Sequence, residues 1–162
     1  VGRGNGKAKL LIIGEGPGRN EDETGLPFVG RAGKLLDQIL ESVEIQSNED
    51  SYISNIVKCR PPENRKPTKE EMGACKPWLE EQIRLINPEI ILLVGATAVE
   101  GILGIKEGIT KIRGSWIEKD GFLYMPIFHP SYLLRNSSKE PGKPKWLTWQ
   151  DIKKVKKKLN SL

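Results

Sequence analysis

The feature of this sequence that most constrains its fold is an unbroken apolar run, Ile90-Ile91-Leu92-Leu93-Val94, followed by Gly95. A strand with no polar positions has both of its faces buried, which is typical of a parallel sheet covered by helices on two sides. Further runs that favour strands lie at residues 10–13, 52–57 and 122–128. Because helical patterns separate these runs, the sequence predicts an α/β protein with a mainly parallel sheet.

The helical segments carry apolar residues at the spacing of one helix face. Expected helices cover residues 29–43, 68–86, 96–103 and 146–159. The second of them opens with Thr68 and Glu71, the two side chains of a capping box. A Lys119-Asp120-Gly121 turn is expected between two strands, and residues 128–136 are expected to form a loop.

Length and composition exclude several classes of protein. The chain has 162 residues, 37% of them hydrophobic, which suits a single domain over residues 1–162. No run is long and apolar enough for a membrane span, no signal peptide opens the chain, and two cysteines are too few for a disulfide framework. We therefore expect a cytoplasmic protein with a basic lean, at a net charge of +5, and no membrane partner. Because the chain starts at Val1 instead of methionine, we also expect that a natural N-terminal segment is missing.

Three loops, at residues 14–28, 55–67 and 128–136, follow predicted strands, where ligands bind in open α/β sheets. The first loop is rich in glycine but does not fit a nucleotide site. The dinucleotide fingerprint needs glycine where this chain has Arg19, and Gly25–Gly30 lacks the Lys-Ser/Thr pair of a P-loop. A flat heterocycle stacked on Phe28 suits the loop better than a phosphate, and a plain flexible turn is the alternative.

The last loop contains the only histidine of the chain, His129. A neutral imidazole can donate a hydrogen bond to developing negative charge or act as an acid or base, whereas many single histidines are merely structural. Leu133 and Leu134 precede Arg135, an arrangement that suits an apolar wedge entering a base stack beside a phosphate contact. Alternatively, the two leucines pack beneath the loop.

Taken together, these segments resemble the family-4 uracil-DNA glycosylases of bacteria and archaea. The matching residues run in order along most of the chain: Gly14-Glu15-Gly16-Pro17-Gly18, Glu21-Asp22, residues 25–33, residues 55–62 with Asn64-Arg65, Cys75, and residues 129–136. Several long motifs in the right order make the resemblance specific.

The resemblance implies a three-layer α/β/α sandwich around a short, mainly parallel four-stranded sheet. It also implies a monomeric, monofunctional enzyme of base-excision DNA repair, associated with a prokaryotic nucleoid. Such an enzyme hydrolyses the N-glycosidic bond of uracil in DNA and leaves an abasic site. Two alternatives stay open: a non-catalytic nucleic-acid-binding domain that keeps the fold, and a nucleotide- or phosphate-binding enzyme of another α/β class.

The resemblance also implies roles for individual residues. Phe28 would stack on an extruded uracil, Asn55 would hydrogen-bond its pyrimidine edge, and His129 would stabilise the departing uracil anion. Leu133 would fill the gap left in the duplex. The remaining expected site residues are Glu15 and Gly16 in the pocket floor, Glu21 near the position of a thymine methyl group, and Arg60, Arg65, Ser131 and Arg135 on DNA. The water could be handled by Glu15, by Glu21, or simply by being bound.

In the family, the positions of Cys59 and Cys75 are two of the four thiolates that hold a structural [4Fe–4S] cluster. The other two lie in a CxxC pair upstream of the first strand, and this sequence contains no such pair. Either the chain is shortened or this protein lacks the cluster. No catalytic cofactor is expected. Arg113 is a further basic residue near the loops, and the lysines at 153–158 are most simply a solvated helix face.

Overall fold

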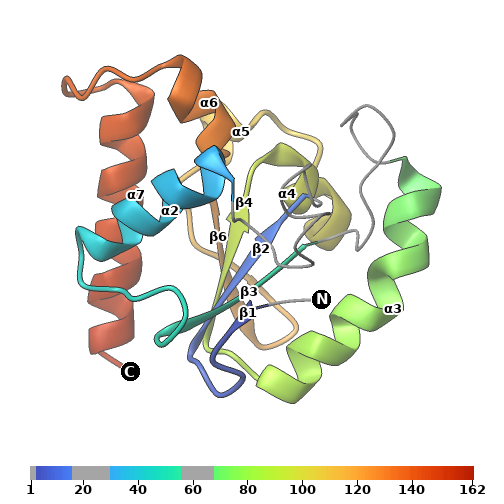
Figure 1. Ribbon diagram of the computed structural model, residues 1–162. Coiled ribbons are helices and arrows are strands. Elements are labelled where there is room, and N and C mark those ends of the chain that lie inside the picture. The colour runs from blue at the N-terminus through green and yellow to red at the C-terminus, as the bar shows by residue number, and fades with distance from the viewer. Residues whose placement is uncertain (1–2, 16–29, 56–67) are drawn as a thin grey trace.

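The computed structural model describes residues 3–15, 30–55 and 68–162. Within these residues, six strands form one sheet in the order β1-β3-β2-β4-β6-β5 (Figure 1). The strands are β1 (Arg3–Gly4), β2 (Leu10–Gly14), β3 (Ser51–Asn55), β4 (Ile90–Val94), β5 (Ile117–Lys119) and β6 (Phe122–Ile127). The four central strands run parallel, as predicted.

The predicted count of four strands is wrong for the sheet as a whole. β1 adds to β3 and β5 adds to β6, both antiparallel, at the two edges. β5 belongs to the hairpin that the Lys119-Asp120-Gly121 turn predicts. β1 has only two residues, which is too short for any hydrophobic pattern to reveal.

Six helices are described: α2 (Arg31–Glu41), α3 (Lys69–Ile86), α4 (Ala96–Leu103), α5 (Ile109–Ile112), α6 (Pro130–Arg135) and α7 (Pro144–Asn160). The four predicted helices are confirmed with small changes at their ends. α5 and α6 were not predicted, because one or two turns are too short to show a period of 3.6 residues. Residues 130–135 therefore form a short helix in the segment that was expected to be a loop.

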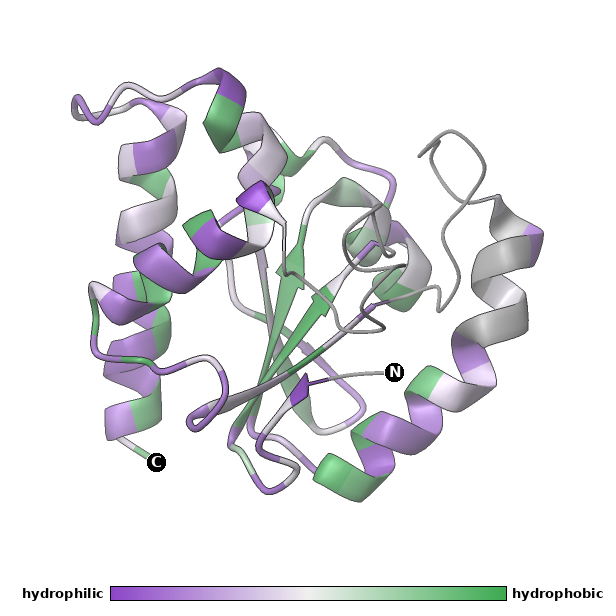
Figure 2. Ribbon diagram, in the orientation of Figure 1, coloured by the Kyte–Doolittle hydropathy of each residue, from purple (hydrophilic) through white to green (hydrophobic). Residues whose placement is uncertain are grey.

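The helices form two layers around the sheet, which confirms the three-layer sandwich (Figure 1). Alternate residues of the strands point to opposite faces. In β2, Leu10 and Ile12 pack in the core beneath α2 and α7, whereas Leu11 and Ile13 pack in the core beneath α3 and α4. Figure 2 shows the apolar strands at the centre and polar residues on the outer faces of the helices. None of the described helices has the length and apolar character needed to cross a membrane.

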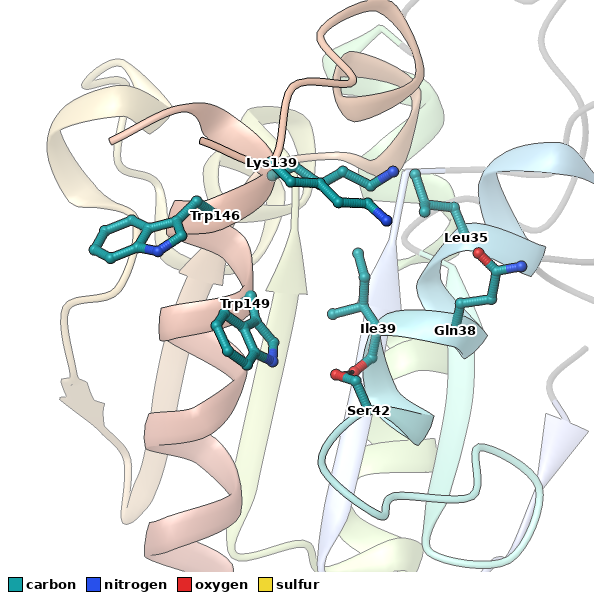
Figure 3. A pocket seen from close by; sticks show the side chains of 8 residues that line it. Leu35, Gln38, Ile39, Ser42, Lys139, Trp146 and Trp149 are labelled. Carbon is teal, nitrogen blue, oxygen red and sulfur yellow. Dashed lines mark hydrogen bonds between the residues drawn. The ribbon is translucent and has the colours of Figure 1, made fainter. Parts of the chain in front are cut away.

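A groove of about 370 Å³ lies between α2 and α7. Figure 3 shows the residues along it, with Leu35 and Ile39 on the α2 side and Trp149 on α7. The full lining is Leu35, Gln38, Ile39, Ser42, Lys139, Lys145, Trp146 and Trp149. The ammonium of Lys153 lies 3.3 Å from the ring centroid of Trp149, so this lysine covers part of the exposed indole.

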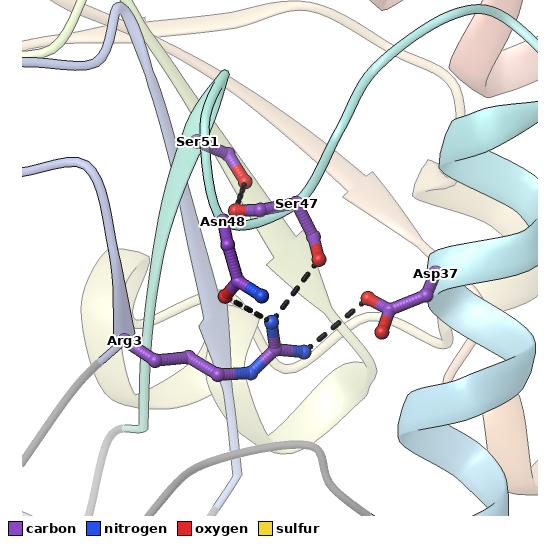
Figure 4. A network of polar contacts seen from close by, with 5 residues as sticks. All are labelled: Arg3, Asp37, Ser47, Asn48 and Ser51. Atoms are coloured by element: carbon purple, nitrogen blue, oxygen red, sulfur yellow. Dashed lines mark hydrogen bonds and ion pairs between the residues drawn. The ribbon is translucent and has the colours of Figure 1, made fainter.

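A polar network fixes the edge strand β1 to its neighbours (Figure 4). The guanidinium of Arg3 donates to Ser47 Oγ at 3.1 Å, Asn48 Oδ1 at 2.8 Å and Asp37 Oδ1 at 3.2 Å. The side chain of Arg3 is only 9% exposed, so these bonds satisfy a largely buried charge. Asp37 lies on α2, and the network therefore joins β1 to the helix that follows the first loop.

Candidate active site at the carboxyl edge of the sheet

Three of the predicted site residues lie where the parallel strands end. Asn55 is the last residue of β3 and pairs with Gly14, the last residue of β2. Glu15 follows directly, and His129 comes two residues after the end of β6. Since β3, β2, β4 and β6 are adjacent and parallel, their carboxyl ends form one edge. The fold thus brings Glu15, Asn55 and His129 to the same side of the molecule, as the sequence predicts.

Asn55 has a largely buried side chain in a fixed strand. It is 5% exposed, whereas Glu15 and His129 are partly exposed. Its neighbour Ser54 donates from Oγ to Gln82 Oε1 at 2.7 Å, a bond that joins β3 to α3. A buried amide is costly unless it is hydrogen-bonded, and it offers both donors and an acceptor in one plane. These groups suit a ligand with alternating polar atoms along one edge.

His129 has its orientation set by the first turn of α6. It is the N-cap residue of that helix, and the main-chain N–H of Ser131 donates to its Nδ1 at 3.1 Å. Because Nδ1 is an acceptor in this bond, the neutral ring carries its proton on Nε2. The preceding Phe128 is buried, and the centroid of its ring lies 5.1 Å from the ring centroid of Tyr132. The backbone therefore presents an imidazole whose Nε2–H can donate.

The structure corrects the role expected for Leu133. Its side chain is 0% exposed and packs in the core cluster with residues of α2 and α7. The alternative that a leucine packs beneath this segment holds for Leu133, because the helical turn of α6 directs it inward. Tyr132 and Leu134 are each 36% exposed, and Arg135 is exposed at the end of the helix. The apolar side chains available to a ligand on α6 are therefore those of Tyr132 and Leu134.

A comparison with known families agrees with this geometry. Residues 1–153 match the family model of the uracil DNA glycosylase superfamily. The chain belongs to this superfamily. It is 50% identical over 158 residues to a type-4 uracil-DNA glycosylase of Thermotoga maritima, covering 96% of this chain and 80% of that protein. A type-4 uracil-DNA glycosylase of Saccharolobus solfataricus is 42% identical over 99% of this chain and 76% of its own length.

The similarity extends at a lower level to another type. A type-5 uracil-DNA glycosylase of Thermus thermophilus is 35% identical over 117 residues, which are 63% of this chain and 52% of that protein. The higher identity and coverage lie with the type-4 proteins, so the family-4 resemblance inferred from the motifs is confirmed.

Several expected site residues of this superfamily member fall outside the described part of the chain. They are Gly16, Glu21, Phe28, Cys59, Arg60 and Arg65. Cys75 lies on α3, but its side chain is likewise outside the description. Their expected roles remain predictions. Ser131 lies within the described residues, and its main-chain N–H donates to His129.

A [4Fe–4S] cluster needs more thiolates than these 162 residues contain. Among the described residues, no three His, Cys, Asp or Glu side chains come together as a metal site. The whole sequence has two cysteines, and a four-iron cluster is held by four thiolates. The donor set of these 162 residues alone therefore does not fit the cluster.

Two residues make contacts that the sequence does not reveal. Gly95, noted only as the end of a strand, lies against the side chain of His129. Arg113, noted as a basic residue near the loops, is paired with the buried Asp151 through two hydrogen bonds. A glycine after a buried strand is a signal for close backbone approach, but the sequence does not say which side chain approaches.

Proposed function

We propose that this chain is a uracil-DNA glycosylase of base-excision repair, which hydrolyses the N-glycosidic bond of uracil in DNA and leaves an abasic site. The type-4 relatives and the superfamily match support the activity. The observation that carries the mechanism is the hydrogen bond from the Ser131 N–H to Nδ1 of His129. It leaves the ring proton on Nε2, from which a neutral imidazole can donate.

Cleavage of the glycosidic bond places negative charge on the departing uracil and positive charge on the sugar. A donor that is already oriented stabilises this anion without any reorganisation at the moment of reaction. We assign this role to Nε2–H of His129. Protonation of Nδ1 would set an N–H against the Ser131 N–H, so the bond favours the neutral ring, which needs no proton transfer to do its work.

The target base has to leave the duplex before His129 can reach it. In this proposal, the amide of Asn55 hydrogen-bonds the uracil edge, Phe28 stacks on the ring, and Gly16 allows close approach of the backbone. Glu21 is proposed to guard the side of the base on which a thymine methyl group would clash. Extrusion of a base costs a few kcal/mol, which these contacts must offset.

The exposed side chains of α6 are suited to the DNA itself. We assign the wedge to Leu134, since Leu133 is buried and Leu134 is half-exposed beside Arg135. Arg135 would contact a phosphate, and Arg60 and Arg65 are proposed to do the same from the second loop. The enzyme is proposed to act as a monomer in the cytoplasm, at the nucleoid.

Glu15 and Glu21 are the carboxylates proposed to handle the attacking water, with a water bound only by the backbone as the third possibility. Replacement of each by glutamine separates these mechanisms. If Glu15 activates the water, Glu15→Gln lowers the single-turnover rate and Glu21→Gln has little effect, and the reverse holds for Glu21. A water that is merely bound predicts a small effect of either change.

We propose, separately, that Cys59 and Cys75 are two of the four ligands of a structural [4Fe–4S] cluster. The test is to express the chain together with any residues that precede Val1 in its gene, and to measure iron, acid-labile sulfide and visible absorbance. Four irons per chain that are lost in Cys75→Ser support the cluster. Iron-free protein that is fully active both with and without those preceding residues contradicts the cluster.

The function is tested by single-turnover release of uracil from an oligonucleotide, followed by alkaline cleavage at abasic sites. We expect wild-type protein to release uracil, and His129→Ala and Asn55→Ala to lose most of the rate. Asn160→Ala, at the exposed end of α7, is the matched control and should keep it. If the wild-type chain binds DNA but releases no uracil, the proposed enzyme activity is wrong and the non-catalytic nucleic-acid-binding domain is the remaining interpretation.

A further inference from the structure

A glycine at the end of β4 lies directly against the ring of His129. Gly95 donates its N–H to the carbonyl oxygen of Ile127 at 2.9 Å, which fixes it beside the end of β6. A Cβ atom on Gly95 would lie 3.1 Å from Cβ and 3.3 Å from Cδ2 of His129. Both distances are shorter than an ordinary van der Waals contact, so any side chain at position 95 would displace the imidazole by a few tenths of an ångström.

The side chain of His129 is thus constrained by two groups. The N–H of Ser131 donates to Nδ1, and a Cβ atom added at Gly95 would meet Cβ, Cδ2 and Cγ of the histidine. These two contacts come from different elements, α6 and the β4–α4 junction. Together they set the direction of the remaining polar atom of the ring, Nε2, which the proposed function uses as a donor.

We propose that Gly95 is a positioning residue of the glycosylase: it sets the direction of the His129 Nε2–H bond by admitting the ring against its bare Cα. The inference rests on the proposed function, because the direction of Nε2 matters only if His129 donates to the leaving base. Directional donors have to be placed within about 0.5 Å to be effective. A displacement of a few tenths of an ångström is comparable to this tolerance, so we expect it to lower the rate only in part, with the imidazole still present.

Gly95 is constrained by its backbone as well as by space. It has φ +92° and ψ 163°, a region that is essentially accessible to glycine only. A substitution at this position would then act through backbone strain, through the His129 ring, or through both. An experiment has to separate these two causes.

The experiment measures single-turnover uracil release and DNA affinity for four proteins: wild type, Gly95→Ala, His129→Gly and the double variant. His129→Gly is chosen because it removes Cβ as well as the ring, and both would contact a new Cβ at position 95. We expect Gly95→Ala to slow the chemical step about tenfold, less than the roughly 100-fold cost of a 1 Å misplacement, with an unchanged DNA dissociation constant. In the His129→Gly background, the same substitution should have no further effect on the rate.

Gly104→Ala is the matched control. Gly104 is the C-cap of the same helix, α4, with φ +71°, and a Cβ there would meet no atom within 4 Å. It imposes positive-φ strain on the same helix without touching His129, and its rate of uracil release should equal that of wild type. A control that slows release as much as Gly95→Ala overturns the proposal, because general strain would then explain both.

Three other results also overturn the positioning role: a wild-type rate in Gly95→Ala, an equal loss in the His129→Gly background, or a loss confined to DNA binding. If Gly95→Ala does not fold, thermal unfolding of the double variant decides. If the double variant unfolds at the same temperature as His129→Gly, the contact is supported. If it remains unfolded or unfolds at a lower temperature, the proposal is overturned. Failure of the proposed function is distinct, because the wild-type chain itself then releases no uracil.

Discussion

Arg113 and Asp151 form a two-bond ion pair in which Nε and Nη2 of the guanidinium each donate to a different carboxylate oxygen at 2.9 Å. The carboxylate is 0% exposed and the arginine side chain 20% exposed. The bond to Asp151 raises the pKa of Arg113, against the opposing effect of burial. The pair joins the end of α5 to the middle of α7, so the charge of Arg113 is matched within the fold.

Removal of one partner of this pair should destabilise the protein. Asp151→Ala leaves a partly buried guanidinium without its carboxylate, and we expect a loss of about 3 kcal/mol in the free energy of unfolding. Denaturant unfolding measures it, with the exposed Lys157→Ala on the same helix as control. Equal stability of the two variants contradicts a structural role for the pair.

The two leucines of α6 should separate packing from DNA contact. Leu133→Ala creates a cavity in the core and is expected to cost about 3 kcal/mol of stability. Leu134→Ala should leave the unfolding midpoint nearly unchanged and slow uracil release from double-stranded DNA more than from single-stranded DNA, where no duplex gap has to be filled. The paired measurements are thermal unfolding and single-turnover rates on both substrates. If a well-folded Leu133→Ala variant releases uracil more slowly from double-stranded DNA alone, Leu133 and not Leu134 is the wedge.

Arg135 should contribute a phosphate contact from its exposed position at the end of α6. Arg135→Ala is expected to weaken DNA binding and to reduce by about one the slope of log affinity against log salt concentration. Fluorescence anisotropy over a salt series measures that slope. Lys158→Ala, on the solvated face of α7, is the control and should have a smaller effect. If the slope is unchanged in Arg135→Ala, this arginine does not contact a DNA phosphate.

Tyr124 gives the fold a dependence on alkaline pH. The residue is only 5% exposed, and burial, together with the negative charge of Asp120, raises its pKa above the ordinary value of about 10. The unfolded chain therefore loses this proton at lower pH than the folded protein does. The contribution of this raised pKa to the free energy of unfolding is fully present below about pH 10, and it is lost as the pH rises through the folded-state pKa.

Tyr124→Phe removes this titration. We expect the unfolding midpoint of wild type to fall more steeply than that of Tyr124→Phe between about pH 9 and about pH 11, since lysines titrate in both proteins. Thermal unfolding over that range measures the difference. Parallel curves for the two proteins are the result that this account does not allow.

Much of this protein is determined by local patterns in its sequence. The unbroken run at residues 90–94 has no polar face, so it can be satisfied only inside a sheet covered on both sides. The α7 segment has its apolar residues on one face, and Ile152 and Val155 are accordingly buried while Lys153 and Lys157 are exposed. Asn55 and His129 could be selected because polar residues after parallel strands gather at one edge.

Other features depend on contacts between residues far apart in the chain, and only the tertiary structure decided them. The sequence placed Leu133 and Leu134 together as a wedge, but the turn of α6 buries one and exposes the other. Arg113 lies 38 residues from Asp151, and no periodicity links two charges at that separation. The contact of Gly95 with His129 likewise arises only because β4 pairs with β6. Periodicity in a sequence reports which face of an element is buried, whereas the partner that buries it is set by the packing of the whole sheet.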